Sequence, residues 1–221
     1  MDAGLTAISK PEVLRYLGHR GQDIDARLDA QIDRCIQAVF SSARPRLTYR
    51  ILEVKDGAIT GLPLQGDDIK ELLSGCSAAI LMAATLGPET EALLSRTELA
   101  DVADALICDC AGSAAIENVC DNFEADMRLQ FRAKGMYLTD RFSPGYGDLP
   151  LDCQGELLSV LEASKRIGLT VTRNNIMIPR KSVTCIIGIA DTPRKLQRSG
   201  CSVCRNAGSC TYRQGGQSCN G

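Results

Sequence analysis

Residues 141–150, RFSPGYGDLP, bring several side chains that can contact a ligand into one short stretch of sequence. The adjacent proline and glycine predict a loop rather than a helix or a strand. A loop that carries Arg, Tyr and Asp together with glycines is more typical of a ligand site than of a simple turn. The structural alternative is that Arg141 only forms a surface ion pair with Asp148 or Asp140.

Four cysteines near the C-terminus form a second candidate site, with the spacing C-x2-C-x5-C-x8-C. The first pair has the short spacing of a metal chelate, and four thiolates suit zinc or an iron–sulfur cluster. The spacing matches no standard ferredoxin pattern, so a redox or disulfide pair and an inert tail stay open as alternatives. The four candidate metal ligands are Cys201, Cys204, Cys210 and Cys219.

The composition argues against several classes of partner. The chain has 221 residues and a net charge of −2, so it has no excess of basic residues that would favour nucleic acid. Aromatic residues make up 4% of the chain and Trp is absent, which disfavours base stacking. No apolar run reaches the roughly 18 residues that span a bilayer, and residues 1–21 lack the layout of a secretory signal. We therefore expect a cytoplasmic protein with no nucleic-acid partner and no membrane partner.

The seven cysteines outside the tail stand in apolar contexts such as LICDCAG. This context predicts small buried hydrophobic side chains rather than a disulfide scaffold. These residues are Cys35, Cys76, Cys108, Cys110, Cys120, Cys153 and Cys185.

The pattern of apolar residues predicts the elements that must position these candidates. Runs of helices and hairpins without regular alternation of strand and helix favour an α+β fold, with helices flanking a mixed or antiparallel sheet. Gly112 and Ser113 would bend the longest helix or allow close packing. Apolar periodicity stops at Asp191, so we expect a folded domain over 1–190 and a Cys-rich tail over 191–221. The expected helices cover 9–18, 23–44, 66–75, 88–96, 98–135 and 153–168, and the expected strands cover 46–54, 56–60, 76–87 and two short segments around Pro179 within 169–190.

Residues 141–189, RFSPGYGDLPLDCQGELLSVLEASKRIGLTVTRNNIMIPRKSVTCIIGI, resemble the C-terminal activation domain of cobalamin-dependent methionine synthase. That domain carries an Arg-x-x-x-Gly-Tyr loop, then a helix, then a strand pair with a similar pattern. AAILMAATLGPETEALLSR and AGSAAIENVCDNFEADMR are similar to its strand and long helix, and EVLRYLGHRGQ resembles small stand-alone relatives. The resemblance covers about residues 9–190 and implies the α+β fold of that domain.

The resemblance also implies a function. The family binds S-adenosylmethionine and uses it to remethylate oxidised cobalamin after a one-electron reduction. A stand-alone protein would act in trans on cobalamin held by a corrinoid protein, such as a methionine synthase lacking its own activation domain or a member of another corrinoid methyltransferase system. Flavodoxin or ferredoxin would supply the electron. The alternative is a non-catalytic corrinoid-protein adaptor whose Cys tail binds a metal or transfers an electron.

The residues that match the family's motif define the expected ligand site. Arg141 would clamp the methionyl carboxylate, because its planar fork of donors suits that group. Ser143 would offer backbone contacts, Gly145 a close backbone approach, and Tyr146 a ring face or a hydroxyl. Glu117 matches an acidic helix residue that faces the same pocket and suits the ammonium and sulfonium charges. The family's early Asp-Trp-Thr-Pro segment is missing, so one acidic contact is not identified.

Overall fold

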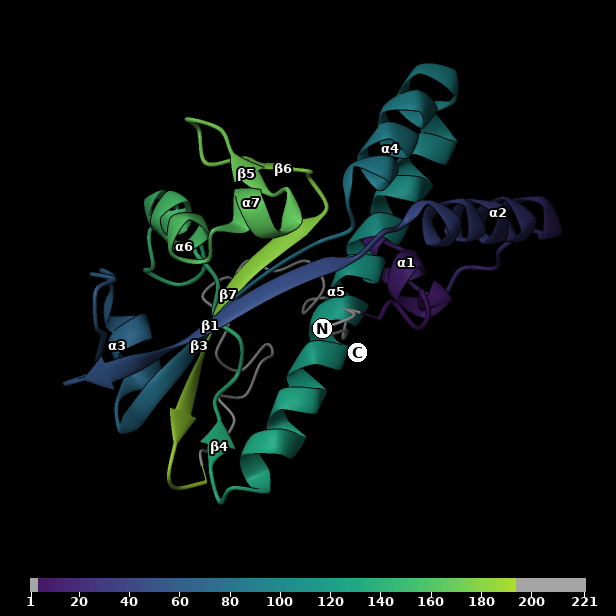
Figure 1. Cartoon of the computed structure of the whole chain (residues 1–221). Helices are drawn as coiled ribbons and strands as arrows, with labels where there is room; N and C mark the ends of the chain where they lie inside the picture. The colour runs from purple at the N-terminus through teal and green to yellow at the C-terminus, as the bar shows by residue number, and fades with distance from the viewer. Residues whose placement is uncertain (1–3, 194–221) are drawn as a thin grey trace.

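The computed structural model describes residues 4–193, and its centre is a five-stranded antiparallel sheet of strand order β2-β1-β3-β7-β4 (Figure 1). A separate hairpin pairs β5 with β6. The strands are β1 Arg46–Lys55, β2 Ala58–Ile59, β3 Cys76–Thr85, β4 Tyr137–Leu138, β5 Thr170–Val171, β6 Met177–Ile178 and β7 Ser182–Ala190. The helices are α1 Lys10–Tyr16, α2 Ala26–Ser42, α3 Asp67–Leu73, α4 Pro88–Ala100, α5 Val102–Arg132, α6 Gln154–Val160 and α7 Ala163–Ile167, with a short 3-10 helix, η1, at Leu151–Cys153.

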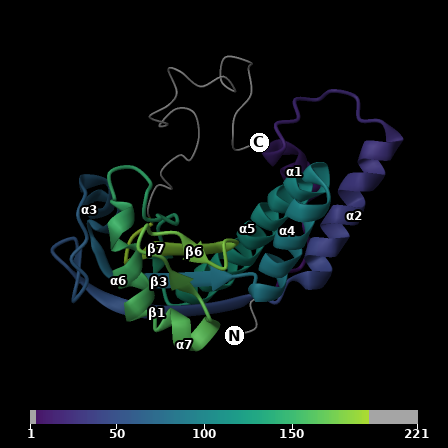
Figure 2. The same ribbon diagram turned by 90° about the horizontal axis from the view of Figure 1, so that it is seen from above.

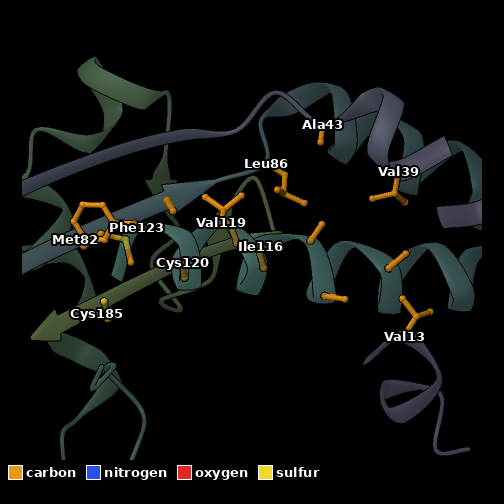
Figure 3. Close-up of a cluster of buried hydrophobic side chains, with 14 of the residues drawn as sticks. Val13, Val39, Ala43, Met82, Leu86, Ile116, Val119, Cys120, Phe123 and Cys185 are labelled. Carbon is orange, nitrogen blue, oxygen red and sulfur yellow. The ribbon is translucent and has the colours of Figure 1, made fainter. Parts of the chain in front are cut away.

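Strand β3 lies between β1 and β7 and is buried on both faces, as its continuous apolar run predicts. Successive side chains of a strand point to opposite faces. Ile80 and Met82 therefore enter one core with Cys185 of β7, whereas Leu81 enters a second core together with Ile186. Figure 3 labels Met82 and Cys185 in the first core. Strand β3 therefore separates the two cores and contributes side chains to both.

The two cores are covered by different helices. Helix α5 lies on one face of the sheet and packs with α1, α2 and α4 around the first core, whereas α3, α6 and α7 cover the other face. Figure 2 shows these two groups on either side of the strands. Helix α5, with 31 residues, is the longest and contacts α1, α2, α4 and β4 along its length. Across residues 4–193, no helix combines the length and the apolar character needed to cross a bilayer.

The expected helix over 98–135 begins later, because Asp101 separates α4 from α5. Asp101 has an extended backbone, and its carboxylate accepts hydrogen bonds from the N–H groups of Ala103 (2.8 Å) and Asp104 (3.0 Å). It is therefore the N-cap of α5. Further along α5, Gly112 allows the close packing that the sequence predicts, in this case against Lys181. A Cβ there would lie 3.0 Å from the Lys181 side chain, whose ammonium reaches Asp109 at 2.8 Å.

The expected helix over 153–168 is divided in the structure into α6 and α7, with η1 directly before α6. Glu162 breaks it by adopting a left-handed backbone with φ 50°, which is costly for a residue with a side chain. The expected strand pair around Pro179 is also different. The short β5–β6 hairpin precedes a cis Ile178–Pro179 bond, and the nine residues of β7 then form a central strand of the main sheet.

The loop 141–150 is fastened to the N-terminus of α3. The Asp148 carboxylate accepts hydrogen bonds from the N–H groups of Asp67 (2.7 Å) and Asp68 (3.1 Å), and the Asp68 carboxylate accepts one from the Asp148 N–H at 3.1 Å. Gly147 has φ 55°, and a Cβ there would collide with the Asp68 carboxylate. The glycine therefore permits the close approach that this reciprocal cap requires.

We expect Asp148→Ala to destabilise the protein by about 1 to 2 kcal/mol, because two N–H groups of α3 lose their acceptor. Chemical denaturation would measure the free energy of unfolding. Asp126→Ala, which removes an exposed carboxylate from α5, is the control and should change stability far less. Equal losses in the two variants would show that the cap does not stabilise the fold.

Candidate functional site

Helix α5 presents a charged stripe at the edge of the core. Glu117, Asp121, Glu124 and Arg128 are spaced by four, three and four residues, so they share one helix face. The neighbouring stripe, one residue earlier at each point, is apolar and buried: Ile116, Cys120, Phe123 and Met127 (the first three labelled in Figure 3). The charged stripe therefore borders the core, with Glu117, Glu124 and Arg128 partly buried and Asp121 exposed.

The segment that leads to Arg141 is held against this stripe from two sides. Arg128 donates to the backbone oxygens of Leu138 and Thr139, both at 2.8 Å. On the other side, the Thr139 N–H donates to the Gly188 oxygen of β7 at 3.0 Å, and Phe142 forms a β-bridge with Ile186. The backbone on both sides of Arg141 is thus fixed between α5 and β7.

Arg141 makes ion pairs with three carboxylates of α5. Its Nη2 lies 2.6 Å from Asp121 Oδ1 and 3.2 Å from Glu117 Oε2, and its Nε lies 3.2 Å from Glu124 Oε2. The side chain is only 21% exposed. The structure brings Arg141 and Glu117 together, and their roles in ligand binding stay predictions.

The two surface ion pairs considered as alternatives for Arg141 are wrong. The Asp140 carboxylate lies 3.3 Å from Nη2 of Arg128. The Asp148 carboxylate caps α3. Arg141 therefore belongs to the α5 cluster rather than to the surface of its own loop.

One guanidinium nitrogen of Arg141 lacks an acceptor. Among residues 4–193, Nη1 is buried and makes no hydrogen bond, which costs about 1 to 3 kcal/mol relative to a satisfied donor. Because Nη1 is buried, a ligand would reach it only after the atoms that cover it move. Nη2, by contrast, pairs with Asp121, which has 63% of its side chain exposed.

Charges in this cluster do not balance. Glu117, Asp121, Glu124 and Asp140 carry carboxylates, whereas Arg128 and Arg141 carry the guanidiniums that pair with them. This is an excess of two negative charges when all four carboxyls are ionised. A ligand that carries both a carboxylate and additional positive charge would fit such a set, because it offers an acceptor to Arg141 and compensates the excess.

Burial raises the pKa of Glu117, and the positive charge of Arg141 only partly opposes this effect. Burial likewise raises the pKa of Asp140, against the opposing charge of Arg128. Both carboxyls therefore keep their protons to a higher pH than solvated ones do. Any cation that binds beside Glu117 would favour loss of its proton.

Asn118 and Asn122, each one residue after a member of the charged stripe, hold the N-terminal segment against α5. The Asn118 Oδ1 accepts hydrogen bonds from the N–H and the hydroxyl of Thr6, both at 3.1 Å, and Asn122 donates to the Gly4 oxygen at 2.9 Å. Helix α1 follows, and its Tyr16 has a pKa raised by burial and further by the Glu117 carboxylate. The start of the chain therefore borders the charged cluster.

The other predicted ligand residues lie in the loop and contact its own backbone. The N–H of Tyr146 donates to the Ser143 oxygen at 3.1 Å, and the N–H of Gly145 donates to the Leu149 oxygen at 3.0 Å. Gly145 has φ 86°, which favours glycine. The Tyr146 side chain is 68% exposed, so its ring is available for contact from outside.

Sequence reasoning missed Asp121, Glu124 and Arg128 as members of the cluster. Their spacing from Glu117 was a usable signal, since charged residues at i+4, i+7 and i+11 share one helix face. What the spacing could not give is the partner, because Arg141 reaches these residues only through the pairing of its segment with β7.

A separate surface hollow of about 490 Å³ lies between α6, α7 and β5, and Leu158, Glu162 and Lys165 are among its lining residues. It contains none of the predicted ligand residues. The structure therefore gives no support to this hollow as the predicted site.

Metal binding by the tail is not addressed by the described part of the chain, because Cys201, Cys204, Cys210 and Cys219 lie outside it. Within residues 4–193, no group of three or more His, Cys, Asp or Glu side chains could hold a metal ion. The cysteines within this range form no disulfide bonds, and all are buried except the partly exposed Cys153. Burial raises the pKa of Cys120 to about 12, which agrees with the hydrophobic role expected for these residues.

Comparisons with known proteins identify the fold. No family model matches the sequence, and no curated protein sequence matches it either. A crystal structure of the MetH reactivation domain bound to AdoHcy aligns with a TM-score of 0.59 and 13% identity, over 96% of this chain and 78% of that chain. A nitroreductase family protein from Streptococcus pneumoniae TIGR4 aligns over 81% of this chain and 86% of its own at 10% identity, with a TM-score of 0.36 that is too low to indicate a common fold. The chain therefore has the fold of the methionine synthase reactivation domain, and the predicted α+β class with an antiparallel sheet is confirmed.

Proposed function

We propose that this protein binds S-adenosylmethionine and provides its methyl group for the reactivation of a corrinoid protein in trans. The main support for the proposal is that three carboxylates of α5 surround Arg141. This cluster lies in a fold shared with a reactivation domain whose structure contains AdoHcy. The partner would be a methionine synthase without its own activation domain, or another corrinoid protein of the cytoplasm.

The charges of the cluster suit the amino-acid end of this ligand. Asp121 is largely exposed, and an exposed ion pair contributes only about 0 to 1 kcal/mol, so a ligand carboxylate could replace it on Nη2 of Arg141. The carboxylates of Asp121 and Glu117 would then face the ligand's ammonium and sulfonium groups. Asp121 would thus supply an acidic contact in place of the one that the family's missing segment provides.

The proposed methyl transfer requires that the protein bind and orient S-adenosylmethionine, and it requires no acid or base catalysis. The partner's corrinoid supplies a reduced cobalt that is strongly nucleophilic, so the methyl group leaves the sulfonium by direct displacement and a neutral thioether remains. The residues of this chain would hold the sulfonium methyl toward that centre. A flavodoxin or a ferredoxin would deliver the electron, and the four tail cysteines would hold zinc or an iron–sulfur cluster.

The direct test mixes the protein with a corrinoid partner, a strong chemical reductant and S-adenosylmethionine. We expect faster formation of methylcobalamin, followed by the absorption spectrum of the corrinoid. Arg141→Ala should remove the acceleration. Failure of the unmodified protein to bind S-adenosylmethionine would instead favour the alternative function of a corrinoid-protein adaptor.

We expect Arg141→Ala to weaken S-adenosylmethionine binding at least tenfold, because a clamp on a partly desolvated carboxylate contributes roughly 2 to 4 kcal/mol. Arg141→Lys should recover only part of the affinity, since a point charge replaces a planar fork. Isothermal titration would give the Kd values. Arg180→Ala is the matched control, because Arg180 pairs with Glu91 and Glu98 outside the cluster. Unchanged affinity in Arg141→Ala would contradict the assignment.

We also expect the affinity to depend on pH through Glu117. Its pKa is raised by burial, and a cationic ligand prefers the ionised carboxyl, so affinity should increase as pH rises through that pKa and level off above it. Titrations across the weakly acidic range would measure the slope. Glu117→Gln should flatten it.

Asp140→Asn is the control for this pH dependence, because Asp140 also has a pKa raised by burial but pairs with Arg128. This variant should flatten the slope less than Glu117→Gln does, because Asp140 contacts Arg128 rather than Arg141. An unchanged slope in Glu117→Gln would show that Glu117 does not contact the ligand's positive charge.

A further inference from the structure

Glu124 connects the two arginines of the cluster. Its Oε1 accepts hydrogen bonds from Arg128 Nη2 at 2.6 Å and Nε at 2.8 Å, and its Oε2 lies 3.2 Å from Nε of Arg141. With 17% of its side chain exposed, Glu124 is less exposed than Glu117 or Asp121. A carboxylate held at both oxygens has little freedom to rotate, so Glu124 fixes the inner edge of the Arg141 guanidinium.

Arg128 adds a second constraint on the same group. Besides Glu124, its guanidinium donates to the oxygens of Leu138 and Thr139 and to Oδ1 of Asp140. One side chain thereby fixes both the carboxylate that contacts Arg141 and the backbone from which Arg141 projects. Four acceptors in different directions require the several N–H groups of a guanidinium, which a lysine cannot provide.

These contacts orient Arg141 in one particular way. Nε lies 3.2 Å from Glu124, the least exposed of the three carboxylates, and Nη2 donates to the more exposed Glu117 and Asp121. The Nη2 edge is therefore the one that an incoming carboxylate can meet. Without the contact to Glu124, the long side chain of Arg141 could adopt several orientations. Only some of them would place its donors on the ligand's carboxylate, so the binding affinity would be lower.

We propose that Glu124 and Arg128 are positioning residues, which hold the guanidinium of Arg141 with its Nη2 edge toward the carboxylate of the ligand. This inference rests on the proposed function, since it takes S-adenosylmethionine as the ligand. It assigns to the two residues a role in recognising one functional group, beyond joining α5 to the segment that precedes the loop.

The experiment compares two ligands, S-adenosylmethionine and its decarboxylated form, which lacks only the carboxylate. Decarboxylation also makes the ligand more positive, which the negative cluster favours, so weaker binding of the decarboxylated form reports the contact of the carboxylate with Arg141, and the ratio of the two Kd values measures it. We expect a ratio of at least ten for the unmodified protein. Arg128→Lys and Glu124→Asp both keep the net charge but lose the geometry, and each should lower the ratio at least threefold. A purely structural role would weaken both ligands alike and leave the ratio unchanged.

Arg180→Lys is the matched control, because Arg180 also joins distant segments through two glutamates. It should keep the ratio of the unmodified protein. Thermal melting would show whether Arg128→Lys and Glu124→Asp are folded, and if one of them fails to fold the other still tests the inference. An unchanged ratio in a folded Arg128→Lys or Glu124→Asp variant would overturn the inference while leaving the proposed function intact. Equal affinities of the unmodified protein for both ligands would also overturn it, and no binding of S-adenosylmethionine at all would remove the proposed function with it.

Discussion

The apolar stripe of α5, formed by Ile116, Cys120, Phe123 and Met127, leaves water only by lying against the sheet. This packing fixes the rotation of the helix about its own axis. Because side chains on a helix keep constant angular offsets, it also fixes where the next stripes point. The charged stripe that starts at Glu117 then faces the segment before the loop. Burial of hydrophobic side chains therefore determines the placement of charges that have no hydrophobic character themselves.

A charge at the border of a core needs compensation, and this requirement explains the density of ion pairs beside α5. An arginine that is largely buried would be strongly destabilising without a partner. Arg141 has three carboxylates near it, two of which remain exposed enough to exchange partners. The cluster thus combines a rigid inner side with an adaptable outer side. Such a division is what a ligand site of mixed charge requires.

Local patterns in the sequence predict much of the fold. The continuous apolar run of β3, the amphipathic stripe of α2 and the Asp56–Gly57 turn between β1 and β2 all carry signals within a short window. The break at Glu162 could not be predicted, because a left-handed backbone at a residue other than glycine is imposed by tertiary contacts. The cap at Asp101 was readable in principle, since Asp is a preferred N-cap residue.

The candidate site shows the same limit. The sequence indicates Arg141 and Glu117 as members of one site only through a family resemblance, and composition alone would not have joined them. Their proximity, at 3.2 Å, depends on β4 and Phe142 pairing with β7, which lies more than forty residues further along the chain. No window of sequence that covers one helix or one loop contains this information. It is a property of the sheet order.

The position of β7 in the sheet also has a consequence for synthesis of the protein. Strand β3 can pair with β1 as soon as both have left the ribosome, but its other edge stays open until residues 182–190 emerge. An open apolar edge invites pairing with other chains, and contacts between distant residues form slowly. The segment around Arg141 pairs with the same late strand, so a nascent chain cannot assemble the candidate site until β7 is in place.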